Sequence, residues 1–320
     1  MHLAKQTSSS SIVCFGGANV DRKHFAHKKV QPRITNHASS VLTFGGVARN
    51  VSEALCYLGF DTSLITCFGE DADAELLRND LSKLNIRTEQ SFVMQGMQTG
   101  FYHALIDVTG DLYVSAVSNL DIYQLVTVEM IEGVWSSISQ VQSVFLDTFF
   151  SAECIQYILA RCKGEGKCLT VNPVSPLESM KLPEDLTGVQ LLVASESEAS
   201  SLSGLSVKCT GDHRSAADRI LARGVESLVI TCADKGAYCY NALGVNQHIA
   251  PPKAEIVDTI GAGDSFIAGM LYSKSKNDDF LTSCKYGLAA AALTVQEKET
   301  VSKTLSVDTI ENTMRLMRDM

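Results

Sequence analysis

The sequence contains no apolar run long enough to cross a membrane, and its first residues, "MHLAKQTSSSS", lack the apolar block of a secretory signal peptide. These two absences exclude the usual signals for membrane insertion and for export. We therefore expect residues 1–11 to form a short disordered tail on a cytoplasmic protein that has no membrane partner.

Cysteine spacing of the metal-binding kind is also missing. The chain has ten cysteines, but no C-x-x-C pair occurs, and most lie inside apolar runs such as "SLITCFG" and "LVITCAD". A zinc motif or a disulfide framework has a different pattern, and the histidines show no metal-ligand spacing. We interpret the cysteines as buried free thiols in a reducing compartment.

Basic residues are outnumbered, with 27 Lys and Arg against 36 Asp and Glu, so the net charge is −9. This balance excludes a general nucleic-acid surface. The chain also lacks internal repeats and low-complexity linkers. A length of 320 residues and 45% hydrophobic content are ordinary for one α/β domain. We expect a single domain from 12 to 320.

The chain does contain short apolar runs rich in Val, Ile and Leu, separated by helical patterns. Continuous rather than alternating hydrophobicity is typical of strands covered on both faces, as in a parallel sheet. In "GGVARNVSEALCYLG", Val47, Val51 and Leu58 share one helix face and Gly59 supplies a stop signal. The pattern predicts an α/β fold with a doubly wound, mostly parallel sheet flanked by helices. The predicted strands are 12–17, 63–69, 143–148, 168–174, 191–195 and 227–232.

Two segments interrupt this alternation. Residues 20–44 are polar and have no helical face, and in 91–118 a "TGD" turn separates two strand-like runs, which predicts a β-hairpin. We expect these segments to build a small β-sheet lid over the active-site edge, where it would exclude water. Such a lid offers a surface for a homodimer, because pairing two copies covers its sheet edges.

Three polar clusters follow predicted strands or open helices: "GGANVD" (16–21), "GGVARN" (45–50) and "DTIGAGD" (258–264). In an open α/β sheet, ligands bind beyond the carboxyl ends of the strands. Asp21 and Asn50, with Asn19 close by, provide acceptors and donors suited to the vicinal diol of a ribose or another sugar. The alternative for Asp21 is a turn or capping carboxylate.

The familiar nucleotide signatures are absent, since the chain has neither G-x-x-x-x-G-K-[ST] nor a G-x-G-x-x-G that opens a first βα unit. This disfavours a P-loop NTPase and a typical dinucleotide-dependent dehydrogenase. Gly261 and Gly263 instead stand at the start of a predicted helix, where backbone N–H groups and the helix dipole bind anions. Asp264 would repel the anion, but it makes sense as a base acting on the group that attacks a phosphate. The alternative is a purely structural turn.

Together, "GGVARN" with Asn50 and the later "DTIGAGD" resemble the paired signatures of the ribokinase-like (PfkB) carbohydrate and nucleoside kinases. The resemblance covers about residues 12 to 300. "GGANVD", the "TN" at 35–36, "GGVARN" and "NPVSP" (172–176) are similar to the pseudouridine kinase branch of that family. This resemblance implies an ATP-dependent kinase that phosphorylates the 5′-hydroxyl of pseudouridine, with Mg²⁺ and K⁺ as cofactors.

The resemblance also implies roles for individual residues. Asp264 would be the base, and the γ-phosphoryl would be held by the backbone N–H groups of Gly261, Ala262 and Gly263. The substrate contacts would be Asn19, Asp21, Gly45, Gly46 and Asn50, with Thr99 as the contact to the nucleobase. The nucleotide contacts would be Ser195, Thr231, Ala233, Gly236 and Gly263. Glu198 would organise Mg²⁺, and Asp258 with the Ile260 carbonyl would bind the monovalent cation.

Two positions depart from the family pattern. Ser195 stands where the N-x-x-E motif has Asn, and Ala233 stands at the first glycine of T-x-G-x-x-G. Both positions would lie at the ATP or Mg²⁺ site, so we expect the affinity for the nucleotide to be altered. Two alternatives remain open: a ribokinase or another sugar or nucleoside kinase of the family, and a catalytically silent relative that only binds nucleosides.

Overall fold

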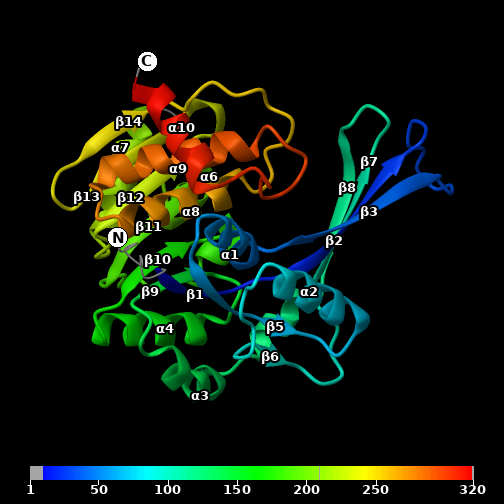
Figure 1. Ribbon diagram of the computed structural model, residues 1–320, viewed down its shortest axis with the longest axis horizontal. Helices are drawn as coiled ribbons and strands as arrows, with labels where there is room; N and C mark the ends of the chain where they lie inside the picture. Colours follow the sequence, from blue (N-terminus) through cyan, green and yellow to red (C-terminus); the bar gives the residue numbers. More distant parts are fainter. Residues whose placement is uncertain (1–9, 209, 319–320) are drawn as a thin grey trace, which may run out of the picture.

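An eight-stranded sheet lies at the centre of the protein in a computed structural model that describes residues 10–208 and 210–318 (Figure 1). Its strands are β1 (Ser11–Phe15), β4 (Asp61–Ile65), β9 (Ser143–Asp147), β10 (Cys168–Asn172), β11 (Val189–Ser195), β12 (Ser227–Thr231), β13 (Ala237–Asn241) and β14 (Asn246–Ile249). Their spatial order is β14-β13-β12-β11-β10-β9-β1-β4. The six neighbouring strands β12, β11, β10, β9, β1 and β4 pair in parallel. Strand β13 pairs antiparallel with β12, and β14 pairs antiparallel with β13.

Helices cover both faces of this sheet because successive residues of the apolar strands point to opposite sides. In β1, for example, Ile12 and Cys14 belong to one buried cluster and Val13 and Phe15 to the other. The first cluster contains α1 (Val47–Tyr57), α8 (Ala262–Ser275), α9 (Phe280–Thr294) and α10 (Val307–Arg318), with part of α2 (Ala72–Lys83). The second contains α3 (Val128–Ile138), α4 (Ala152–Gly164), α6 (Glu196–Ser203) and α7 (Thr210–Leu221). The shorter elements are α5 (Pro176–Ser179), η1 (Leu120–Leu125) and η2 (Ala233–Lys235).

The predicted doubly wound parallel sheet is confirmed, and each of the six predicted strands is present. The run at 63–69 is divided between β4 and a two-residue strand, β5 (Cys67–Phe68), which pairs with β6 (Phe92–Val93) in a separate sheet. The antiparallel strands β13 and β14 were not predicted, because their half-buried, mixed sequences lack the long apolar run of the parallel strands.

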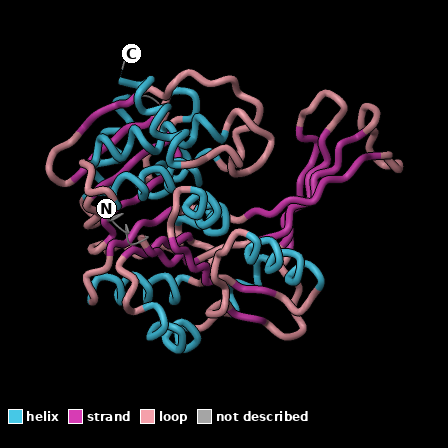
Figure 2. Tube along the Cα trace, viewed as in Figure 1, coloured by secondary structure: helices cyan, strands magenta, loops and turns pink. Residues whose placement is uncertain are grey.

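A separate small sheet projects from the body of the protein (Figures 1 and 2). It consists of β2 (Asn19–Ala26), β3 (Ala38–Gly45), β7 (Phe101–Ile106) and β8 (Leu112–Ser118), in the order β3-β2-β7-β8. The predicted "TGD" hairpin is confirmed as the antiparallel pair of β7 and β8. Ser11, the last residue of the predicted tail, already belongs to β1, and residues 1–9 lie outside the described residues.

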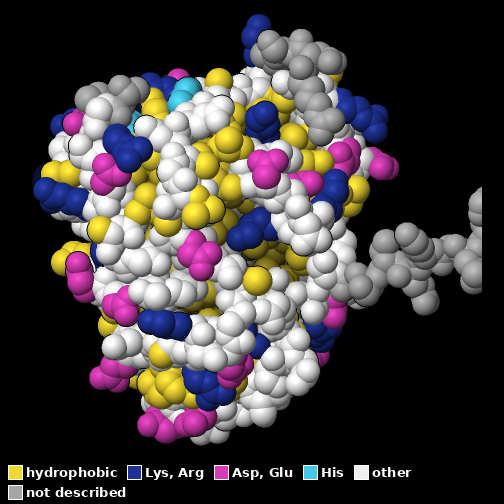
Figure 3. Space-filling view, turned by 90° about the vertical axis from the view of Figure 1, so that its left-hand side faces the viewer, with side chains coloured by type: hydrophobic (Ala, Val, Ile, Leu, Met, Phe, Trp, Pro, Cys, Tyr) yellow, Lys and Arg dark blue, Asp and Glu magenta, His cyan; other side chains and the backbone are white. Residues whose placement is uncertain are grey.

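The described cysteines agree with the prediction of free thiols. All nine are free and seven of them are buried, while Cys209 lies outside the described residues. Within the described chain, none of the helices is long and apolar enough to cross a membrane. On the face shown in Figure 3, basic and acidic side chains are interspersed rather than gathered by sign.

Candidate active site

The first two polar clusters meet where the small sheet joins the main sheet. Strand β1 ends at Phe15 and β2 starts at Asn19, while β3 ends at Gly45 just before α1. Antiparallel pairing places Asn19 opposite Gly45. A Cβ at Gly45 would lie 2.4 Å from the Asp21 carboxylate, and Gly46 has φ 98°, so both positions require glycine.

Asp21 is a buried carboxylate at this junction. Its side chain accepts a hydrogen bond from the amide of Asn19, and only 8% of the residue is exposed. Desolvation raises the pKa of Asp21 to about 6, although the positive charges of Lys23 and Arg49 act in the opposite direction. The junction therefore holds an acceptor that is poorly solvated and available to a ligand hydroxyl.

Asn50 and Asp264 are in direct contact although 214 residues separate them. The Asn50 Nδ2 donates to Asp264 Oδ2 at 2.8 Å, and the Arg49 Nη1 donates to Asn50 Oδ1 at 3.1 Å. Arg49 is itself held by Glu53 and by Asp80, whose Oδ2 lies 2.7 Å from Arg49 Nη2. This series of contacts orients the Asn50 amide so that its nitrogen faces Asp264.

Asp264 lies in the first turn of α8. The helix is capped by Gly261 at φ 79°, and a Cβ there would lie 1.7 Å from the Thr300 carbonyl oxygen. At Gly263, by contrast, a Cβ would meet nothing within 4 Å among the described residues, so this part of the turn is open. Burial raises the pKa of Asp264 to about 7; the Asn50 hydrogen bond lowers it, and the charge of Asp147 raises it further.

Asp147 was missed by the sequence analysis, although it lies next to the end of the predicted strand 143–148 and ends β9. Its side chain is fully buried and accepts hydrogen bonds from the backbone N–H groups of Gly17 (2.8 Å), Ala48 (3.0 Å) and Phe149 (3.0 Å). Asp147 thereby joins the end of β1, the start of α1 and the end of β9. Burial raises the pKa of this carboxyl to about 7. A carboxylate at the end of an apolar strand was the available signal.

Ser195 and Glu198 form a capping box at the start of α6. The Glu198 N–H donates to Ser195 Oγ at 3.3 Å, and the Ser195 N–H donates to Glu198 Oε2 at 2.8 Å. The "SESE" segment, interpreted above as a departure from N-x-x-E, therefore also carries the S-x-x-E capping signature. Burial raises the pKa of Glu198.

The residues after β12 adopt an unusual backbone conformation. Ala233, which is exposed, has φ 46°, a value that favours glycine. Gly236 has φ 89°, and a Cβ there would lie 2.1 Å from the Ile249 carbonyl oxygen. Thr231 donates its hydroxyl to the Ala194 carbonyl at 3.4 Å, which ties β12 to β11.

Asp258 and Ile260 lie together ahead of α8, since the Ile260 N–H donates to Asp258 Oδ1 at 3.0 Å. The sequence analysis overlooked Lys23 of β2. Its ammonium lies 3.9 Å from Asp258 Oδ2, and the residue is only 9% exposed. Alternation along β2 places Lys23 on the same face as Asp21.

Thr99 is not brought to the other predicted residues by its side chain. It is fully buried, its hydroxyl donates to Asp71 Oδ1 at 2.8 Å, and the same oxygen accepts from the Gly69 N–H at 3.1 Å. The hydroxyl is therefore engaged by these partners, and the contact of Thr99 with a nucleobase stays a prediction.

A hollow of about 350 Å³ lies elsewhere, beside the start of β4, and is lined by residues that include Asp61, Ser63 and Arg87. Arg87 and Asp61 form an ion pair there. We place the candidate site at the carboxyl edge instead, because the carboxylates with raised pKa and the glycine turns meet there.

Comparison with known proteins agrees with this geometry. The family model described as pfkB family carbohydrate kinase matches residues 9–306. The chain belongs to this family. It is a sugar or nucleoside kinase, a phosphotransferase with an alcohol group as acceptor.

Relatives within the pfkB family are distant. The chain is 24% identical over 296 residues to a pseudouridine kinase from Escherichia coli (strain K12), covering 92% of this chain and 94% of the relative. It is 26% identical over 295 residues to a ribokinase from Staphylococcus aureus (strain COL), covering 90% and 94%. The ribokinase of Arabidopsis thaliana, solved with ribose and ATP, superposes with a TM-score of 0.79 at 18% identity, covering 97% of this chain and 99% of that one. The fold is therefore ribokinase-like.

Proposed function

We propose that the protein is an ATP- and Mg²⁺-dependent kinase that phosphorylates the 5′-hydroxyl of pseudouridine to give pseudouridine 5′-phosphate. The observation that carries this proposal is the 2.8 Å hydrogen bond from Asn50 to Asp264. It joins the cluster suited to a sugar with the turn suited to a phosphate. A kinase needs these two functions side by side, since the sugar hydroxyl attacks the phosphoryl group.

In this proposal Asp264 accepts the proton of the 5′-hydroxyl as that oxygen attacks the γ-phosphoryl group. A carboxyl whose pKa is raised to about 7 is a stronger base than a solvated one, yet it is largely ionised slightly above neutral pH. The N–H groups of Gly261, Ala262 and Gly263 bind the transferring phosphoryl at the positive end of α8.

The ribose is held at the junction of the two sheets. Asp21 and Asn50 bind its hydroxyls, with Asn19 orienting Asp21 through their hydrogen bond. Gly45 and Gly46 are proposed to contact the sugar through their backbone; a side chain at either position would collide with Asp21 or with Gly17. Thr99 is proposed as the contact on the side of the nucleobase.

The nucleotide and the metal lie on the other side of Asp264. We propose Ser195, Thr231, Ala233, Gly236 and Gly263 as nucleotide contacts. Glu198 fits Mg²⁺, because a buried carboxylate with a raised pKa lacks a compensating positive charge and offers the hard oxygen that this ion prefers. Bound Mg²⁺ neutralises phosphate charge.

A monovalent cation, K⁺, is proposed beside the Asp258 carboxylate and the Ile260 carbonyl. Both are oxygen donors and therefore suit this ion. The Lys23 ammonium, 3.9 Å from Asp258, already supplies positive charge at this place. Activity measured in K⁺, Na⁺ and a bulky organic cation tests whether K⁺ is needed.

The small sheet acts as the lid in this proposal, and two copies pair through it. Its outer strands β3 and β8 carry exposed apolar side chains, among them Val41, Leu42, Val114 and Val117. Covering them in a dimer removes apolar surface and sheet edges from water. Light scattering of the wild-type protein and of Val114→Lys tests this: a dimer that becomes a monomer supports the pairing.

The substrate is tested by ADP release with Mg²⁺-ATP and K⁺, comparing pseudouridine with uridine, adenosine, ribose and fructose. Both the pseudouridine kinase and the ribokinase described above cover nearly the whole chain. Preference for pseudouridine supports the proposal. Preference for ribose or another nucleoside replaces the substrate and keeps the kinase mechanism.

A second candidate is a relative that binds nucleosides without turnover. The observation that favours it is the backbone of Ala233, held at φ 46° where a glycine is expected, next to the proposed phosphate contacts. This candidate predicts that pseudouridine raises the melting temperature while Mg²⁺-ATP neither raises it nor supports ADP release.

A further inference from the structure

Three side chains with no part in the proposed phosphoryl transfer converge beyond the end of β12. Glu196 is the first residue of α6, His213 lies near the start of α7, and Cys232 follows β12 directly. The His213 Nε2 lies 2.8 Å from Glu196 Oε1 and 3.3 Å from Cys232 Sγ. Among residues 10–208 and 210–318, this is the single place where three such ligand atoms lie within 4.8 Å of one another.

A single proton on His213 Nε2 can serve only one of its two close contacts. The Nε2 of an imidazole has one in-plane direction, which either donates a hydrogen or accepts one, whereas both the Glu196 oxygen and the Cys232 sulfur approach it. If Nε2 donates to the carboxylate, it cannot also accept from the thiol, which then has the Ile230 carbonyl oxygen at 3.5 Å as its acceptor. A cation between the three atoms would meet a lone pair from each of them.

The separations are close to those of a zinc site. Zn²⁺ binds His nitrogen at about 2.0–2.1 Å, Cys sulfur at about 2.3 Å and carboxylate oxygen at about 2.0–2.2 Å, usually as a tetrahedron. These bond lengths imply ligand-to-ligand distances of roughly 3.3–3.6 Å. The two separations from His213 Nε2 need to lengthen by less than about 1 Å to reach them, and the Glu196 and Cys232 ligand atoms lie within 4.8 Å of each other.

We propose that Glu196, His213 and Cys232 form a zinc-binding site with three protein ligands. His213 and Cys232 are buried, whereas the Glu196 side chain is 36% exposed, so the fourth position opens to solvent on the Glu196 side. On binding, the thiol S–H bond breaks, its proton passes to solvent and the sulfur electron pair bonds to Zn²⁺.

The ligands are held by rigid neighbours, which reduces the entropy lost on binding. The His213 ring stacks on Tyr238 with 4.1 Å between ring centroids. Glu196 follows Ser195, whose capping box with Glu198 fixes the start of α6. The site is distinct from the proposed Mg²⁺ site at Glu198, because a set containing thiolate and imidazole favours Zn²⁺ over Mg²⁺.

Metal titration of the full chain tests the proposal without ATP or nucleoside, so its outcome is independent of the proposed function. Protein stripped with a chelator is titrated with Zn²⁺ against a chromophoric competitor, with and without millimolar Mg²⁺. We expect one Zn²⁺ per chain, undisturbed by Mg²⁺. Cys232→Ala and His213→Ala should each weaken binding by at least about 100-fold, because an outer-shell partner alone is worth 10- to 100-fold.

Cys168→Ala is the matched control, since Cys168 is a partly buried cysteine at the start of β10, away from the cluster. It should bind zinc as the wild type does. Absence of stoichiometric binding, or binding unchanged in Cys232→Ala, would overturn the proposal. If a variant does not fold, Co²⁺ added to the wild type decides: a thiolate-to-cobalt charge-transfer band supports the site, and its absence refutes it.

Discussion

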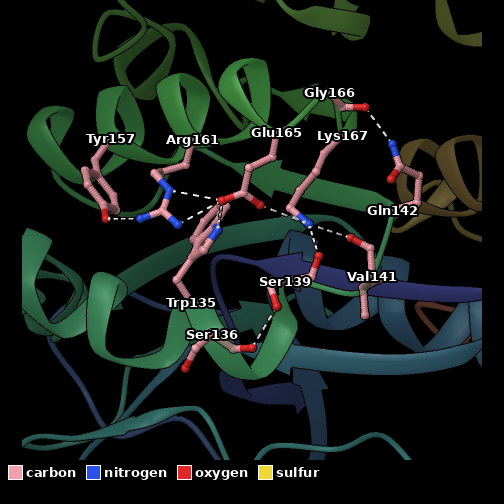
Figure 4. A network of polar contacts seen from close by, with 10 residues as sticks. All are labelled: Trp135, Ser136, Ser139, Val141, Gln142, Tyr157, Arg161, Glu165, Gly166 and Lys167. Atoms are coloured by element: carbon pink, nitrogen blue, oxygen red, sulfur yellow. Dashed lines mark hydrogen bonds and ion pairs between the residues drawn. The ribbon is translucent and has the colours of Figure 1, made fainter.

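The polar groups at the amino ends of the main-sheet strands (the amino edge) and those at the carboxyl ends (the carboxyl edge) have opposite properties, and β9 has a part in both. At the amino edge, the buried Lys167 donates from Nζ to the carbonyl oxygens of Ser139 at 2.7 Å and Val141 at 2.9 Å (Figure 4). Its ammonium also lies 3.4 Å from Glu165. Every contact in this group compensates the buried charge.

Glu165 completes the network at the amino edge. It accepts from Trp135 Nε1 at 2.8 Å and pairs with Arg161, whose guanidinium lies 5.0 Å from the centre of the Trp135 indole (Figure 4). Hydrogen bonding to Arg161 lowers the pKa of Glu165. The carboxylate is therefore more stable in the folded protein than in the unfolded chain.

At the carboxyl edge the carboxylates have the opposite property. Burial raises the pKa of Asp21 to about 6 and those of Asp147 and Asp264 to about 7. Each of these charges costs folding free energy at neutral pH. The contrast indicates that the amino edge stabilises the fold, whereas the carboxyl edge keeps groups in an unfavourable state that chemistry can use.

Asp264→Asn should produce the largest effect. Loss of the proposed base should reduce kcat by about 10³-fold, within the range for general base catalysis. Nucleoside affinity, measured by calorimetry, should change little because Asn has the same shape. Glu165→Gln at the amino edge is the control and should keep wild-type kcat. Turnover of Asp264→Asn within tenfold of wild type would remove Asp264 from the proposed role.

Lys167→Met should affect stability and spare activity. The change leaves the carbonyl oxygens of Ser139 and Val141 without their donor, and we expect a loss of about 3 kcal/mol in the free energy of unfolding. Urea denaturation measures the loss, and kcat for the folded fraction should remain within twofold of wild type. A large fall in kcat would contradict the assignment of stability to the amino edge and of catalysis to the carboxyl edge.

The carboxyl edge should also give stability a characteristic pH dependence. In the unfolded chain Asp side chains lose their proton near pH 4, whereas folded Asp147 and Asp264 keep it up to about pH 7. The folded state therefore binds more protons in this interval, and these groups make the free energy of unfolding fall as pH rises from about 4 to 7. Between pH 4 and pH 8 Asp264→Asn should lose about 4 kcal/mol less of its free energy of unfolding than the wild type does. Denaturation at several pH values measures this, and an identical profile for both proteins would contradict it.

Ala233→Gly should give the smallest effect, a gain of about 1 kcal/mol in the free energy of unfolding. Ala233 has φ 46°, where the Cβ of an L-residue is strained and glycine is not. Thermal unfolding measures the gain. The control is Ala242→Gly, which should not stabilise the protein because Ala242 is not among the residues with positive φ. Ala233→Gly should also alter the KM for ATP if the turn that contains residue 233 contacts the nucleotide.

Much of the fold was predictable because its signals are local. A run such as 143–148 identifies a buried strand by itself, and the glycines at 261 and 263 mark the start of α8 wherever that helix packs. Asn50 and Asp264 were each predicted as site residues from their own neighbourhoods. Their mutual hydrogen bond followed only from the packing of α1 against α8.

Other features depend on partners that are distant in the sequence and were not predictable. Arg49 gains its role from Asp80, and Lys23 gains its role from Asp258. Glu196, His213 and Cys232 come from three separate elements, so no spacing rule detects their convergence. The strain at Ala233 is a property of the backbone that residue identity alone does not reveal.

The residues proposed to hold the ribose are also the points where the small sheet is attached. Asn19 opens β2, Gly45 ends β3, and both strands leave the body there. Any rotation of the small sheet relative to the body would therefore pivot at the residues proposed to contact the sugar. By thermodynamic reciprocity, whatever free energy the sugar gains from a closed lid must equally favour closure when the sugar binds. If the small sheet is the proposed lid, sugar binding and lid closure form a single equilibrium, and the unbound enzyme needs no separate sensor to stay open.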